Sequence, residues 1–209
     1  MEYSFHLYNK LAADGVAMTA DRLLRADFRR KTQKSKGAGT DLSPKTPPNE
    51  NQPPVVLCVG SDLAIGDSLG PICGSMLKYK TQGIHAYVYG TLSAPITAKE
   101  IDYAREFLQK THKGSQIIAV DAAVGEHGDI GLIKLGDSPL LPGAGANKKL
   151  GAIGDISVLG IDAEKSVANY GLLNTTRLNL VYTMAELISE GLASLLWERC
   201  SGEKILSEA

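Results

Sequence analysis

Val55-Val56-Leu57-Cys58-Val59-Gly60-Ser61-Asp62-Leu63-Ala64-Ile65-Gly66-Asp67-Ser68-Leu69-Gly70-Pro71 is the stretch that decides the fold. Five apolar residues run unbroken to Gly60, a pattern typical of a strand that is buried on both faces, as in a parallel sheet. Asp67 and Ser68 are residue types that often cap helices, and Pro71 is tolerated in a first helical turn. The stretch therefore predicts a strand, a polar loop and the start of a helix. In an open α/β sheet, ligands bind at such loops.

The rest of the chain repeats this alternation of strand and helix. Strands are expected at 55–59, 84–89, 116–120, 130–135 and 156–161, and helices at 68–80, 97–110 and 175–199. Strands that alternate with helices favour an α/β fold with three layers, α/β/α, and a mostly parallel central sheet. The strand at 130–135 could close a short hairpin with the strand before it, through Gly125 to Gly128. The last helix could pack on its own sheet or on a second copy of the chain.

Composition divides the chain into three parts. Residues 1–28 predict an N-terminal helical extension, and residues 29–54 are rich in Lys, Ser, Gly and Pro. The second part cannot bury enough apolar area to offset its ordering entropy, so a disordered linker is expected there. Residues 55–209 form the α/β domain, which is long enough to enclose a sizeable core.

Charge and composition restrict the partners. The net charge of −1 gives no reason to expect nucleic acid or an anionic membrane surface, and no apolar run is long enough to span a bilayer. The N-terminus lacks the pattern of a secretory signal. Cys58, Cys73 and Cys200 have no CxxC spacing and are interpreted as buried or partly buried thiols of a reducing compartment. We therefore expect a cytoplasmic protein.

Two aspartates are the main candidates for chemistry. Asp67 and Asp121 each follow an expected parallel strand, so both should lie at the carboxyl edge of the sheet. Two carboxyl groups that meet in a poorly hydrated crevice cannot both ionise cheaply, so one would act as a general acid and the other as a general base. Their oxygens could equally hold a divalent metal, although no resident cofactor is expected. The structural alternatives are a helix cap at Asp67 and a strand-end hydrogen bond at Asp121.

The other candidates are weaker. Asp62 is a binding candidate, but it also suits a turn, because its side chain can bond to the backbone two residues further on. The loop at 143–151 contains Gly143 and Gly145, whose backbone amides could approach a ligand, and Lys148, which could attract a carboxylate or phosphate. A plain surface loop is the alternative. The four histidines lie in no ligand-spaced pair, and no Ser, Cys or His grouping predicts a nucleophilic triad.

Several motifs resemble those of the YyaC-type sporulation proteins. They occur in the family's order across 55–199: Gly60-Ser61-Asp62, Gly66-Asp67-Ser68-Leu69-Gly70-Pro71, Tyr89-Gly90-Thr91-Leu92, Ile118-Ala119-Val120-Asp121-Ala122, Pro142-Gly143-Ala144-Gly145 with Asn147-Lys148, Gly154-Asp155, and Asn174-Thr175-Thr176-Arg177-Leu178. The resemblance adds Asn147 to the binding candidates of the loop.

This family is similar to the spore germination protease and, more distantly, to the hydrogenase maturation peptidases. The resemblance implies a phosphorylase/hydrolase-like sheet between helix layers and a peptidase acting on a protein or peptide, in the cytoplasm of the forespore or spore core. It also implies catalysis by Asp67 and Asp121, which match the two aspartates of the germination protease. In the hydrogenase peptidases, comparable acids hold the nickel of the substrate.

Two departures weaken the analogy. Leu63-Ala64-Ile65 stands where YyaC-type members often carry Arg-Ser-Thr, which removes a cation. Pro95-Ile96-Thr97-Ala98 stands where they tend to have Pro-Val-His-Ala, which removes a histidine. Three hypotheses therefore stay open: an aspartate-dependent endopeptidase, a non-catalytic binding module on the same scaffold, and a metal-dependent hydrolase.

Overall fold

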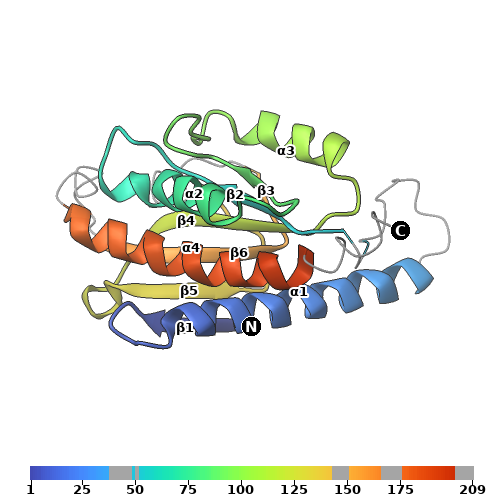
Figure 1. The fold of residues 1–209 in the computed structure, drawn as a ribbon, viewed down its shortest axis with the longest axis horizontal. Helices are drawn as coiled ribbons and strands as arrows, with labels where there is room; N and C mark the ends of the chain where they lie inside the picture. The colour runs from blue at the N-terminus through green and yellow to red at the C-terminus, as the bar shows by residue number, and fades with distance from the viewer. Residues whose placement is uncertain (38–48, 50–51, 143–150, 166–175, 201–209) are drawn as a thin grey trace.

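A mixed six-stranded sheet is the centre of the computed structural model, which describes residues 1–37, 49, 52–142, 151–165 and 176–200 (Figure 1). The strands are β1 (Glu2–His6), β2 (Val55–Cys58), β3 (Tyr87–Tyr89), β4 (Ile117–Gly125), β5 (Leu132–Gly136) and β6 (Ile156–Glu164), in the spatial order β1-β5-β6-β4-β2-β3. Strands β3, β2, β4 and β6 are parallel, whereas β5 runs antiparallel to β6 and β1 antiparallel to β5. The predicted α/β class with a mostly parallel sheet is confirmed.

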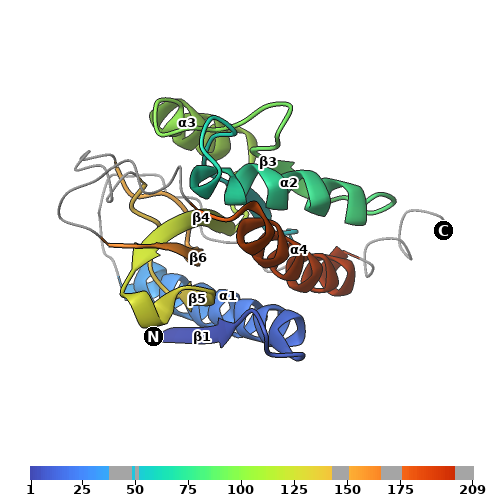
Figure 2. The same cartoon turned by 90° about the vertical axis from the view of Figure 1, so that its left-hand side faces the viewer.

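Helices cover both faces of this sheet. They are α1 (Ala12–Gly37), α2 (Leu69–Lys80), α3 (Ile101–Thr111) and α4 (Leu178–Cys200), with short 3-10 turns η1 (Gly66–Ser68) and η2 (His127–Asp129). Helices α1, α2 and α4 pack on one face, and α3 lies on the other (Figure 2). The predicted three-layer arrangement is therefore present.

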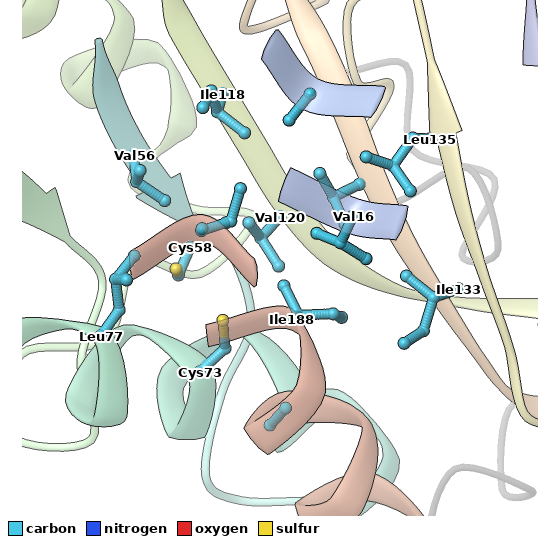
Figure 3. Packing of buried hydrophobic residues seen from close by; sticks show 14 of the residues in the cluster. Val16, Val56, Cys58, Cys73, Leu77, Ile118, Val120, Ile133, Leu135 and Ile188 are labelled. Atoms are coloured by element: carbon cyan, nitrogen blue, oxygen red, sulfur yellow. The ribbon is translucent and has the colours of Figure 1, made fainter. Parts of the chain in front are cut away.

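Strand β2 is buried on both faces, as its unbroken apolar run predicts. Val56 and Cys58 pack among α1, α2 and α4, as Figure 3 shows for the cluster around Cys73. Val55 and Leu57 belong to the second apolar cluster, which contains Ile101, Ala104 and Leu108 of α3. Alternate residues of one strand thus supply both halves of the core.

The hairpin expected between the strands at 116–120 and 130–135 is absent. Strand β5 pairs with β1 and β6 rather than with β4, and β6 lies between β4 and β5. Strand β4 also continues to Gly125, beyond its predicted end at 120, because β6 extends alongside it. Turn signals in the sequence concern neighbouring residues only, so they could not predict that β4 pairs with the distant strand β6.

The N-terminal part of the chain belongs to the same sheet and core. Strand β1, which we did not predict, pairs with β5, and its Tyr3 and Phe5 pack against the core. Helix α1 runs to Gly37, so the linker predicted from residue 29 is wrong over 29–37. Its remaining positions 38–48, 50 and 51 lie outside the described residues.

A polar network holds the second half of α1 to the sheet. Lys31 forms ion pairs with Asp27 and Asp155, and Gln116 donates hydrogen bonds to the Leu24 carbonyl (2.8 Å) and to Asp27 (2.9 Å). Burial lowers the pKa of Lys31, but its hydrogen bonds and attraction to Asp155 and Asp27 outweigh this and leave the pKa raised. These charged pairs explain why a helix continues through a polar segment that we interpreted as a linker.

The helices of the described part are too short or too polar to cross a bilayer.

Candidate functional site

The loop between β2 and α2 is held by close backbone packing. Gly60 has a φ of +137°, and a Cβ at Gly70 would lie 1.9 Å from the Val59 carbonyl oxygen. Only glycine fits such a close approach, so α2 begins directly against the end of β2. Asp67 lies in η1, and the N-cap position of α2 belongs to Ser68, whose hydroxyl instead donates to the Ile65 carbonyl at 2.6 Å. The expected helix cap is therefore absent, and the Asp67 carboxyl group is left for another role.

Asp121 lies in the middle of β4 rather than at its end, which corrects the strand-end interpretation. Strand β2 is shorter: its last paired residue, Cys58, is opposite Val120, and the Val59 N–H donates to the Val120 carbonyl at 2.8 Å. Asp121 is thus the first residue of β4 that extends past β2. It therefore lies beside the loop that carries Asp67. We predicted the same neighbourhood for Asp121, but on the assumption that β4 ended there.

The two aspartates interact electrostatically. Burial raises the pKa of Asp121 well above its ordinary value, the negative charge of Asp67 raises it further, and the Ala122 N–H, 2.9 Å away, acts against both. Burial also raises the pKa of Asp67, opposed by a backbone hydrogen bond from Ser61. A partly exposed base beside a more strongly protonated acid is the combination that general acid–base chemistry requires.

A third carboxyl group, Asp162, joins this pair and was missed in the sequence. It is only 3 % exposed, and neither carboxylate oxygen has a hydrogen-bond partner. Burial first, and then the charge of Asp67, raise its pKa to about 7; its charge in turn raises the pKa of Asp121. The signal was present, because Asp162 follows the predicted strand at 156–161 just as Asp121 follows the one at 116–120.

Of the other predicted site residues, only Asp62 belongs to the part of the chain that the structure describes. Asp62 is exposed, and Ser61 makes the turn expected of it, by accepting the Leu63 N–H at 3.2 Å. Gly143, Gly145, Asn147 and Lys148 lie outside the described residues. The binding roles of all five therefore stay predictions.

Nothing cationic is paired with the three aspartates in the described ranges. Each ion pair found there joins other groups. Leu63, at the position where a family cation was expected, is 92 % exposed. Across the same residues, no group of three His, Cys, Asp or Glu side chains is arranged to hold a metal ion. Within those ranges, no ion pair therefore opposes the raised pKa values of the three aspartates.

The order of these elements and motifs agrees with the sequence comparisons. The pattern of the family described as "Protein of unknown function (DUF1256)" matches residues 32–191. The chain belongs to the DUF1256 family. It is 43 % identical over 142 residues to the uncharacterized protein YyaC of Bacillus subtilis strain 168, which covers 68 % of this chain and 69 % of that protein. The resemblance to YyaC-type proteins is therefore confirmed.

Structural comparison of this DUF1256 member finds a weaker likeness. The [NiFe] hydrogenase maturation protease HycI from Thermococcus kodakarensis KOD1 is 16 % identical with a TM-score of 0.47, and the match covers 68 % of this chain and 90 % of that protein. A likeness of this size does not assign a function to the DUF1256 chain.

Proposed function

We propose that this protein is an aspartate-dependent peptidase in which Asp67 and Asp121 form the catalytic pair. The observation that supports it is their electrostatic interaction: two carboxyl groups from separate elements each have a raised pKa, and the charge of Asp67 raises the pKa of Asp121 further. The resemblance of both positions to the germination protease supports the same assignment. The proposed substrate is a small protein or peptide of sporulation or germination, met in the cytoplasm of the forespore or spore core.

The chemistry needs one proton on the pair. Asp67, the carboxylate, accepts a proton from a water molecule whose oxygen attacks the peptide carbonyl carbon, while Asp121 donates its proton to the carbonyl oxygen. The tetrahedral product carries two hydroxyl groups. When the C–N bond breaks, Asp67 gives its proton to the leaving nitrogen and a hydroxyl proton returns to Asp121. Both residues then regain their initial protonation.

The test is cleavage by the wild type and by the variants Asp67→Asn and Asp121→Asn. The probes are the small-protein fraction of bacterial spores and unfolded β-casein, with fragments detected by mass spectrometry. Each variant should lose at least about 100-fold in rate, because each removes one of the two proton-transfer groups. Asp102→Asn, an exposed position in α3, is the control and should cleave like the wild type. Cleavage that survives both site substitutions would exclude the proposal.

A non-catalytic binding module is the second candidate, favoured by the exposed Leu63 and by the missing family cation. It predicts that no probe is cleaved and that a partner is still captured by the Asp67→Asn variant. A divalent metal held by Asp67 and Asp121 is the third candidate. It predicts metal retained in proportion to protein by the wild type and lost in either variant, as measured by elemental analysis.

A further inference from the structure

A groove of about 490 Å³ lies where α1 passes beside the last turns of α4 (Figure 1). Most of its lining comes from the outer side of α1, and α4 contributes Glu198. An ion pair between Asp21 of α1 and Arg199 of α4, with an N–O distance of 2.7 Å, joins the two helices at this place. The volume is within the range of about 300–1,000 Å³ that is usual for ligand sites. The groove shares no residue with the aspartate site.

Arginine is the commonest residue type in the lining. Arg22, Arg25 and Arg29 follow one another at intervals of about one helical turn on the exposed side of α1. Arg25 pairs with Asp21 at 2.6 Å, and Arg199 binds the same carboxylate. Burial raises the pKa of Asp21, but the hydrogen bonds from Arg25 and Arg199 outweigh it and leave the pKa lowered. The acid that α1 contributes to the groove is therefore ionised and already engaged.

The other two arginines of the groove keep their charge available. Within the residues that the structure describes, neither Arg22 nor Arg29 forms an ion pair. The guanidinium of Arg22 lies only over the Tyr3 ring, 6.0 Å from its centre. The next cations along the helix, Arg30 and Lys31, are by contrast engaged by aspartates. The groove thus presents an excess of positive charge to the solvent.

The same groove has an apolar part. Ala17, Met18 and Ala26 line it, and the Met18 side chain is 72 % exposed. Small alanines let another chain approach closely, and a methionine side chain adapts to different apolar partners. A phosphate or a nucleic acid would use the arginines but not these side chains, and Glu198 would repel a uniformly anionic ligand. The combination suits an amphipathic helix that carries acids and apolar side chains on one face.

We propose that this groove binds an acidic helical segment of another protein, whose carboxylates pair with Arg22 and Arg29 and whose apolar side chains pack on Met18 and Ala26. Seven residues separate the two arginines, a rise of about 10.5 Å along α1. Two acids seven positions apart on a second helix have the same separation and share one face. A second copy of this chain suits the groove less well, because a two-fold contact would bring the arginines of both copies together. The proposal does not depend on the proposed peptidase activity.

The test is the fluorescence anisotropy of a labelled helical peptide of about 15 residues, with two glutamates seven positions apart and leucines on the same face. The wild type should bind it saturably in about 50 mM NaCl and more weakly in about 500 mM NaCl, where exposed charges are screened. A peptide with lysines in place of the glutamates should not bind. These comparisons need only the wild-type chain.

A charge-reversed variant locates the binding. The full-length chain with Arg22→Glu and Arg29→Glu should bind the acidic peptide at least about tenfold more weakly, since attraction is replaced by repulsion at two positions. Lys78→Glu with Lys113→Glu is the matched control, because it changes the net charge equally at exposed positions outside the groove. This control should bind like the wild type, and circular dichroism verifies that both variants are folded.

Three results would overturn the proposal. The first is no saturable binding of the acidic peptide by the wild type, or equal affinity in the wild type and the arginine variant. The second is binding to vesicles with about 30 % phosphatidylserine but not to the peptide, which would assign the groove to a membrane surface. The third concerns residues 201–209, which lie outside the described ranges and include Glu203 and Glu208. If the peptide binds only after both are replaced by Gln, the occupant is this segment of the chain itself rather than another protein.

Discussion

Asp155, the residue just before β6, exchanges two hydrogen bonds with Ile117, the first residue of β4. The Ile117 N–H donates to Asp155 Oδ2 at 2.8 Å, and the Asp155 N–H donates to the Ile117 carbonyl at 2.7 Å, while the other carboxylate oxygen pairs with Lys31. One side chain thus fixes the start of β6 against β4 and connects both to α1.

Asp155→Ala should therefore be destabilising. It leaves the Ile117 N–H without its acceptor and Lys31 with one carboxylate fewer, so we expect a loss of about 2–4 kcal/mol in the free energy of unfolding. Urea unfolding monitored by circular dichroism measures it. Asp102→Ala removes an exposed ion pair with Arg105 and should change stability by no more than about 0.5 kcal/mol. Equal effects of the two substitutions would contradict the role given to Asp155.

Gly70→Ala should disrupt the loop that positions Asp67. Its Cβ would lie 1.9 Å from the Val59 carbonyl oxygen, a backbone atom that cannot move aside without shifting β2. We expect a loss of about 3 kcal/mol or more, measured by thermal and urea unfolding. Gly128→Ala is the matched control, because a Cβ there meets nothing within 4 Å and should leave stability nearly unchanged.

The stability of the wild type should depend on pH through Asp162. Its pKa is about 7 in the folded protein and near 3.8 when unfolded, so between these values the folded state binds more protons. Stability is then greatest below pH 4 with respect to this group, and falls as pH rises towards 7, by at most about 4 kcal/mol. Asp162→Asn removes this dependence. The difference in unfolding free energy between variant and wild type should therefore grow in the variant's favour from pH 5 to pH 8, and a constant difference would contradict the assignment.

The thiols should be unreactive in the folded protein. Cys58, Cys73 and Cys200 are all buried, and the sulfur atoms of Cys58 and Cys73 lie close together in the core (Figure 3). A hydrogen bond with Cys73, together with burial, raises the pKa of Cys58 and disfavours its thiolate, the form that reacts. An aromatic disulfide reagent should titrate three thiols in 6 M guanidinium chloride and far less than one within minutes under native conditions. Rapid native labelling would show that the core opens.

The sequence predicted the centre of the fold better than its edges. The apolar run at Val55–Val59 indicates a buried strand by itself, and the glycines that follow it indicate a tight loop. Strand β2, the loop and α2 could therefore be predicted from neighbouring residues alone. Strand β1 has no such signal, because its pairing with β5 joins residues more than 120 positions apart. The length of α1 depends on the ion pairs of Lys31 with Asp27 of the same helix and with Asp155 just before β6, and composition alone does not show the second of these.

The candidate site shows the same division. Asp67 and Asp121 could be proposed because each follows an apolar run, although Asp121 extends past β2 because β2 is short and not because β4 ends there. Asp162 follows an apolar run too, but it is the surplus residue at a pairing irregularity, where Ala123 of β4 is opposite Ile161 and Val124 is opposite Ala163, and only the paired strands show this.

That irregularity has an evolutionary consequence. The third acid depends on one surplus residue, so a single-codon deletion in β6 would restore regular pairing and remove it while sparing Asp67 and Asp121. Whether this acid is kept can therefore be decided by the length of one strand rather than by a substitution.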